Sequence, residues 1–166
     1  MSRHIKFSSV GNDLTDRLED CKCYKTKRKI TSISVHCSFS PQGRGDDAHT
    51  IDAWHKQRWG SGIGYHYVVL EDGTLQKGRW VDYAPAAVKG YNAHNIAICR
   101  IGGMDEHGHA THDATSEQIE TIIELTQCLI DTYGLEPGDV LGHTEYKGVL
   151  KSCPLMDMGN VRSRLS

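Results

Sequence analysis

The stretch ITSISVHCS, residues 30–38, decides the fold class because β-branched side chains recur at alternate positions along it. Such a run is typical of a strand with one buried face, and we expect the folded core to begin here. His36 lies in this run directly after Val35, so an imidazole that points inward needs a polar partner. The stretch therefore predicts a strand of the central sheet and a histidine with a partner beside it.

Helices are expected from the spacing of apolar residues and from capping signals. They cover residues 49–58, 116–133 and 156–165. The middle helix has the clearest pattern: Thr115 or Ser116 can cap it, Gln118 completes a capping box with Thr115, and Gly134 follows its last turn. The first helix carries one stripe of side chains, formed by Ile51, Trp54, His55 and Arg58.

Further strands are expected at residues 65–70, 75–79, 95–101 and 139–143. The turn EDGT (71–74) joins the first two as a hairpin, because Asp-Gly supplies the positive φ angles of a tight turn. We expect a loop at SPQGRGDD (40–47) and a polar hairpin loop, rather than a metal tract, at HGHATH (107–112). Because strands and helices interleave, we predict an α/β fold with a single mixed β-sheet flanked by helices.

The composition, with 38% hydrophobic and 24% charged residues among 166, is typical of one globular domain. No apolar run approaches the ~18–20 residues of a membrane span, and the N-terminal residues lack the apolar segment of a secretory signal. We therefore expect a cytoplasmic protein with a catalytic domain at 30–166. Residues 1–29 form a basic leader that is either irregular or an extra edge element, and its charge indicates either an anionic partner or a solvated extension.

Cysteines are not spaced as in a disulfide framework. Cys37, Cys99 and Cys128 lie in apolar patterns and are expected to be buried and reduced. Cys21 and Cys23 form a CxC pair with no second pair nearby, so a structural zinc site there is not expected.

One thiol and two imidazoles stand at positions that suit a metal. His143 follows the predicted strand 139–143, Cys153 precedes Pro154, and His36 lies in the first strand. Two histidines and one thiolate are a suitable ligand set for a catalytic Zn²⁺, which keeps its fourth position for water. The alternative is a buried structural cysteine and two histidines with ordinary core partners.

Several motifs occur in an order that resembles a known family. They are VHCS (35–38), WHK (54–56), GYHYVVLEDGTLQKGR (64–79), KGYN (89–92), IGG (101–103), GHTE (142–145) and KSCP (151–154). Together they resemble the type 2 N-acetylmuramoyl-L-alanine amidases, especially the small lysozymes of lytic coliphages, which are related to peptidoglycan recognition proteins. The resemblance implies a mixed sheet flanked by helices and one zinc ion per chain. It also implies cleavage of the amide between muramic acid and L-alanine.

The family motifs fall on particular residues of this sequence. The resemblance implies zinc ligands at His36, His143 and Cys153, a catalytic tyrosine at Tyr65 and a catalytic lysine at Lys151. Without it, Tyr65 reads as a strand residue whose hydroxyl reaches solvent, and Lys151 as a surface lysine.

Four further residues are candidates for contacts with the substrate. Glu145 could orient a ligand imidazole or simply be solvated. His66 and His94 could line the cleft or be structural, and Asn92 could bind backbone groups or a sugar. Ala87 stands where many relatives carry a histidine, and the loop YKGVL (146–150) is longer than the resemblance implies.

The predicted function is a zinc-dependent peptidoglycan hydrolase, a phage or prophage endolysin that causes lysis of the host cell. A cytosolic amidase that recycles anhydro-muropeptides is one alternative. Another is a non-catalytic module that binds peptidoglycan, although retention of Cys153 argues against it. Because the coliphage relatives also inhibit a polymerase, the resemblance adds a possible RNA polymerase partner. We expect a monomer and no nucleic-acid partner.

Overall fold

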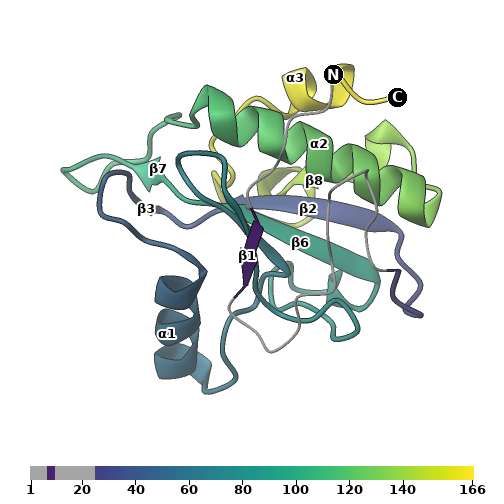
Figure 1. Cartoon of the computed structure of the whole chain (residues 1–166), viewed down its shortest axis with the longest axis horizontal. Helices are drawn as coiled ribbons and strands as arrows, with labels where there is room; N and C mark the ends of the chain where they lie inside the picture. The colour runs from purple at the N-terminus through teal and green to yellow at the C-terminus, as the bar shows by residue number, and fades with distance from the viewer. Residues whose placement is uncertain (1–6, 10–24) are drawn as a thin grey trace.

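The computed structural model describes residues 7–9 and 25–166. Its main sheet has six strands in the order β1-β5-β4-β6-β2-β8 (Figure 1). Only β4 and β5 pair antiparallel; the other neighbours are parallel, so the sheet is mixed as predicted. The strands are β1 (Phe7–Ser9), β2 (Ser32–Cys37), β4 (Tyr67–Val69), β5 (Leu75–Lys77), β6 (Asn95–Arg100) and β8 (Val140–Gly142).

Helices cover both faces of this sheet (Figure 1). The long helix α2 (Ser116–Tyr133) packs with α3 (Met158–Ser163) on one side, over a core that includes Ile33, Val35 and Ile98. Helix α1 (Ala48–Trp59) lies on the other side, over a smaller cluster with Val68 and Cys99. Because side chains alternate along a strand, the opposite face of β2 carries Ser34 and His36. His36 therefore lies on the α1 side of the sheet.

The helix termini follow from local sequence. Thr115 caps α2 and forms the predicted capping box with Gln118, while Gly134 ends the helix at a φ of 65°. On the stripe of α1, Ile51 and His55 are buried, whereas Arg58 is exposed near the last turn. The predicted closing helix is confirmed over the shorter range of α3.

Strand boundaries differ from prediction where pairing depends on distant segments. The predicted strand 65–70 contains only β4, and Tyr65 precedes it. The predicted loop 40–47 begins with β3 (Ser40–Pro41), which pairs with β7 (Gly103–Met104) in a second, two-stranded sheet. Residues 107–112 belong to a hairpin loop as predicted, because Met104 bridges Ala110 in antiparallel fashion.

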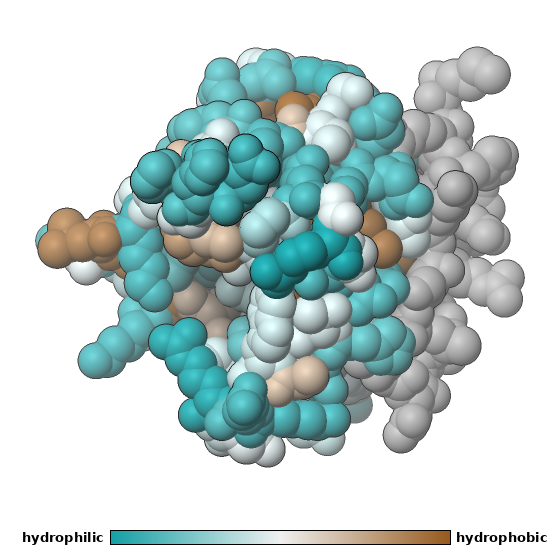
Figure 2. All heavy atoms as spheres, turned by 90° about the vertical axis from the view of Figure 1, so that its left-hand side faces the viewer, coloured by the Kyte–Doolittle hydropathy of each residue, from teal (hydrophilic) through white to brown (hydrophobic). Residues whose placement is uncertain are grey.

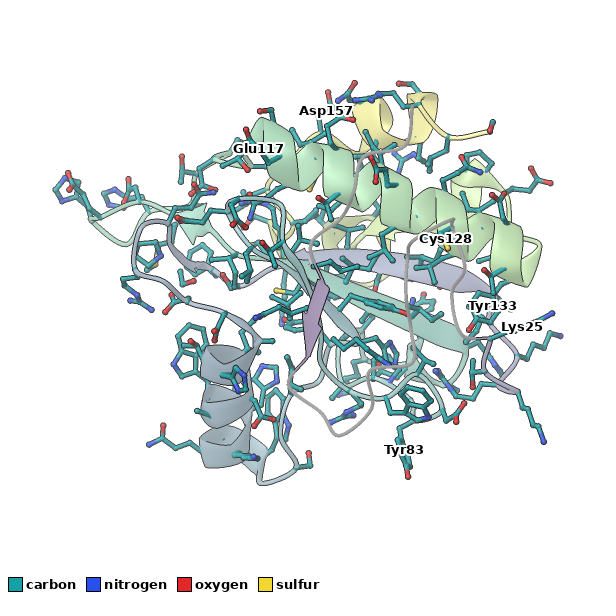
Figure 3. The ribbon with its side chains drawn as sticks, viewed as in Figure 1. Lys25, Tyr83, Glu117, Cys128, Tyr133 and Asp157 are labelled. Carbon is teal, nitrogen blue, oxygen red and sulfur yellow. The ribbon has the colours of Figure 1, made fainter. Side chains whose placement is uncertain are left out.

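Residues 25–29 contact the domain. The Thr26 amide donates to the Tyr133 hydroxyl at 3.0 Å, beside Lys25 at the end of α2 (Figure 3). The Arg28 guanidinium donates to the carbonyl oxygens of Val81 and Asn95 at 2.8 and 3.0 Å.

Other predictions outside the sheet have different outcomes. Cys37, Cys99 and Cys128 are buried and reduced, as predicted, whereas Cys21 and Cys23 lie outside the described residues. Among the helices of residues 25–166, none is long and apolar enough to cross a membrane.

Candidate active site

Two neighbouring parallel strands bring the predicted histidines together. Val35 of β2 pairs with Gly142 of β8, so the next residues, His36 and His143, lie side by side at the carboxyl ends of these strands. Their Nδ1 atoms are 3.2 Å apart, and the ring centroids are 4.6 Å apart. The two imidazoles therefore direct one nitrogen each toward the same point.

Cys153 completes this cluster. Its Sγ accepts a hydrogen bond from the Cys37 amide at 3.0 Å, which places the thiol beside the end of β2. One ligand atom each from His36, His143 and Cys153 lie within 4.8 Å of one another. We call these three residues the His-His-Cys cluster.

A buried arginine holds the segment that carries Cys153. Arg100 of β6 is fully buried; its Nε and Nη2 donate to the carbonyl oxygens of Pro154 and Leu155 at 3.1 and 2.8 Å. Its Nη1 pairs with Asp113 at 2.7 Å. A side chain on Gly142 would place its Cβ 2.7 Å from Pro154 Cδ, so glycine before His143 permits this close approach. The cluster thus depends on the packing of residues 153–155.

Electrostatics favour neutral imidazoles in the cluster. Burial lowers the pKa of His36 well below its usual value, and the charges of His143 and Lys151 lower it further. Burial and Lys151 also lower the pKa of His143. A hydrogen bond with the Cys37 thiol and burial raise the pKa of Cys153, so a cation must displace its proton to bind there.

The donor set fits zinc. Nitrogen ligands bind Zn²⁺ at ~2.0–2.1 Å, and tetrahedral geometry then separates two of them by about 3.3 Å. The 3.2 Å between the two Nδ1 atoms agrees with that separation. Two neutral imidazoles and one thiolate leave a fourth position for water or substrate.

Tyr65 lies against the same cluster. Its ring centroid is 5.1 Å from that of His36, and burial raises the pKa of its hydroxyl well above 10, helped by the nearby cysteines. The Gly64 amide donates to Nδ1 of His55 in α1 at 2.8 Å, which holds the segment before β4. Ring contacts then run outward from Tyr65 to His55 and from His55 to the exposed Trp59. Figure 2, viewed from the α1 side, shows a hollow in this face.

The second predicted catalytic residue is exposed. Lys151 precedes Cys153 by two residues, and its charge lowers the pKa of both histidines of the cluster. Because the Lys151 ammonium lowers the pKa of both imidazoles, it is near enough to stabilise negative charge that develops beside them.

Comparison with known proteins assigns the family. A family model described as N-acetylmuramoyl-L-alanine amidase matches residues 26–155. The chain belongs to this amidase family. Endolysin of Klebsiella phage KP32 is 33% identical over 134 residues, 80% of this amidase and 86% of the relative. Endolysin of Escherichia phage T7 is 30% identical over 135 residues, which are 81% of this chain and 87% of the relative. The predicted amidase activity and family are therefore confirmed.

Solved structures show the same fold. The amidase resembles LysCS, an endolysin from Clostridium intestinale URNW, with a TM-score of 0.74 and 23% identity over 99% of this chain and 97% of that one. It resembles Drosophila PGRP-LB with a TM-score of 0.65 and 16% identity over 90% and 88% of the two chains. At these identities the likeness concerns the fold alone, and it confirms the predicted mixed sheet flanked by helices.

Glu145 stabilises the backbone of this amidase beside the cluster. Its Oε1 accepts from the Gly142 amide at 2.8 Å, and both carboxylate oxygens pair with Arg162. The Arg162 guanidinium keeps the pKa of Glu145 below its usual value. These contacts fix the turn before His143, so they differ from both alternatives considered for this residue, an imidazole partner and a solvated carboxylate.

The other candidate substrate contacts are engaged by backbone groups. The two ring nitrogens of the buried His66 bind the Tyr83 carbonyl and the Ala97 amide at 2.9 and 3.0 Å. The Asn92 side chain accepts from two amides of residues 87–88. The exposed His94 binds the Lys29 carbonyl at 2.9 Å. These contacts favour the structural alternatives for all three.

Some residues around the cluster are not singled out by the sequence. They are Ser34, Asn95, Arg100, Asp113 and Tyr146. A signal exists for Arg100, because an arginine inside the apolar run 95–101 needs buried partners. The polar residues Ser34 and Asn95 in strands with apolar neighbours are a weaker signal of the same kind.

Proposed function

We propose that this amidase is an endolysin that uses one zinc ion, held by His36, His143 and Cys153, to cleave peptidoglycan. The bond is the amide between N-acetylmuramic acid and the L-alanine of the stem peptide. The observation that carries the proposal is the convergence of two neutral imidazoles and one thiol in a confirmed member of the amidase family.

The residues of the site have distinct tasks in this reaction. When bound, zinc would polarise the scissile carbonyl and acidify a water molecule. Tyr65 stays a neutral phenol at physiological pH, because its pKa is raised, so it can donate a hydrogen bond but cannot act as a base. Lys151 offers a positive charge to the carbonyl oxygen as that oxygen becomes negative.

The comparisons support the endolysin role over the recycling amidase. The phage endolysins align over 86–87% of their own length, so the likeness covers nearly the whole relative. A binding module without catalysis is disfavoured by Cys153, whose thiol lies beside both histidines. The RNA polymerase partner and the monomeric state remain predictions; size-exclusion chromatography with light scattering and a polymerase pull-down would test them.

The test of the proposed function is digestion of purified sacculi followed by mass spectrometry. We expect free stem peptides that begin with L-alanine, no activity after chelation, and recovery when zinc is restored. Release of new saccharide reducing ends instead would contradict amide cleavage.

A matched variant tests the metal assignment. Cys153→Ser replaces a thiolate donor by a neutral hydroxyl, so we expect the variant to lose most of its zinc and its activity. Cys128→Ser is the control, because Cys128 is a buried, reduced thiol on α2, and its replacement should leave the zinc content unchanged. Normal zinc content and activity in Cys153→Ser would show that the ligand is another residue.

A further inference from the structure

A chain of polar side chains leads away from His36 on the side of its ring that does not face His143. His36 Nε2 lies 2.8 Å from Ser34 Oγ, which lies 2.7 Å from Asn95 Oδ1. Asn95 Nδ2 donates to the Tyr146 hydroxyl and to Ser32 Oγ, both at 2.9 Å. Ser34 and Asn95 are fully buried, and Tyr146 is 5% exposed, so water does not compete for these groups.

Sheet register explains why these residues meet. Ser32 on β2 pairs with Asn95 on β6, and side chains at alternate positions of β2 share one face. Ser32, Ser34 and His36 therefore form a row, beside which the Asn95 amide lies. Tyr146 follows η4 (His143–Glu145), so its contacts also tie the segment after His143 to this row.

The acceptors define the direction of each hydrogen bond. The Ser32 carbonyl oxygen lies 3.4 Å from Asn95 Nδ2 and can only accept, so the amide nitrogen belongs on that side. Asn95 Oδ1 then faces Ser34 and has no proton, so the Ser34 hydroxyl must donate to it. The lone pairs of Ser34 Oγ are left facing His36 Nε2, and that nitrogen must carry the proton.

We propose that Ser34 and Asn95 are positioning residues that hold His36 in the tautomer with its proton on Nε2. This leaves the lone pair of Nδ1 free in the His-His-Cys cluster. The inference rests on the proposed zinc site, and it assigns to these two residues the choice of which nitrogen of His36 binds the ion. Partners of this kind typically change metal affinity by about 10–100-fold when they are removed.

The test combines nitrogen NMR of the metal-free protein with zinc titration against a chromophoric chelator. In the parent protein we expect the ¹⁵N shifts of His36 to show a protonated Nε2. In Ser34→Ala the proton should redistribute to Nδ1, and the zinc Kd should rise by about 10–100-fold. Ser34→Thr retains a hydroxyl and should restore both the tautomer and the affinity.

Thr126→Val is the matched control, since it deletes a buried hydroxyl whose bonds to described residues stay within α2. It should lower stability without changing the zinc Kd. A parent protein with His36 protonated on Nδ1 would overturn the proposal, as would a Ser34→Ala protein with unchanged tautomer and affinity. The parent spectrum decides the first point even if Ser34→Ala does not fold. A parent that binds no zinc would overturn the proposed metal site, while the nitrogen shifts would still decide the tautomer.

Discussion

Tyr65 and Lys151 approach the His-His-Cys cluster with different charges and different burial. Tyr65 is a neutral donor because burial raises its pKa, and its ring contact with His36 fixes it beside the cluster. Lys151 is exposed and positively charged, and it can reorient without disturbing the core. In the proposed reaction the neutral hydroxyl of Tyr65 and the charge of Lys151 complement each other. Only the interaction with the cation becomes much stronger when negative charge develops on the substrate.

Replacement of Lys151 separates a catalytic role from a surface role. Lys151→Met keeps the length of the stem and removes the charge, so we expect wall-cleaving turnover to fall by ~10²–10³. Zinc content and melting temperature should change little, because surface substitutions stay within about ±0.5 kcal/mol. The measurement is the rate of stem-peptide release at saturating sacculi.

Lys147→Met is the matched control, because Lys147 is an exposed lysine in the same loop and uses only its backbone carbonyl, toward the Tyr91 hydroxyl. It should retain full turnover. If both variants lose activity equally, the loss reflects the loop or its general charge rather than Lys151.

At the scale of elements, β6 supports the cluster through Arg100. We expect Arg100→Met to lower the free energy of unfolding by about 3–5 kcal/mol, because it removes the cation that pairs with Asp113 and leaves two buried carbonyl oxygens without this donor. Zinc affinity should fall as well, since residues 153–155 lose their anchor. Urea unfolding and the zinc titration measure the two effects.

The control for Arg100 is Arg164→Met, which removes an exposed ion pair with Glu120. Such pairs contribute about 0–1 kcal/mol, so its stability should stay near that of the parent. A loss of similar size in both variants would contradict the role assigned to Arg100.

Which elements can be predicted from the sequence depends on how local their causes are. Strand β2 follows from its own alternation, and α2 follows from its stripe and its capping box. The pairing of β3 with β7 cannot be predicted this way, because it joins segments distant in the sequence. The predicted boundaries of β4 are wrong for the same reason, since the neighbouring strands β5 and β6 determine its length.

The candidate site shows the same division. His36, His143 and Cys153 are predicted because each lies in a motif that resembles the family. The Ser34–Asn95 contact is not predicted, because it depends on the register of β2 against β6, which leaves no local signal in one sequence. Arg100 can be predicted in part. Its charge in an apolar strand indicates that it needs a partner, but the sequence does not indicate that the partner is Asp113.

For the whole molecule, the stability should fall in mild acid. Burial lowers the pKa of His66 to about 3 and that of His55 to about 4, whereas both groups have a pKa near 6.5 when unfolded. The unfolded chain therefore takes up protons first as pH falls, so stability is complete above about pH 6.5 and decreases below it. At pH 5.5 each histidine should remove on the order of 1 kcal/mol of stability.

Urea unfolding at pH 7.5 and pH 5.5 measures this loss. We expect His55→Gln, whose amide oxygen can still accept from Gly64, to show a smaller difference between the two pH values than the parent. His107→Gln alters an exposed histidine and should leave the difference unchanged. An unchanged difference in His55→Gln would mean that this histidine titrates alike in both states.

The leader can be tested at the same scale, since we propose that catalysis needs only the domain at 30–166. A chain without residues 1–29 should retain zinc and the specificity of cleavage. It should unfold more easily than one without residues 1–24, because it lacks the Arg28 hydrogen bonds to the carbonyl groups of residues 81, 92, 93 and 95 and the Thr26 hydrogen bond to Tyr133. Hydrogen bonds to charged groups contribute about 1.5–3 kcal/mol each. Equal stability of the two truncated chains would show that residues 25–29 contribute nothing to the stability.

The parallel pairing of β2 with β8 also determines when the His-His-Cys cluster can form during synthesis of the protein. β2 is translated well before its partner β8 and before Cys153. Domains fold as units, so β2 must wait for the residues up to β8 before this pairing can form. A nascent chain therefore carries His36 without its two companions, and translation products that stop before Cys153 lack the cluster altogether.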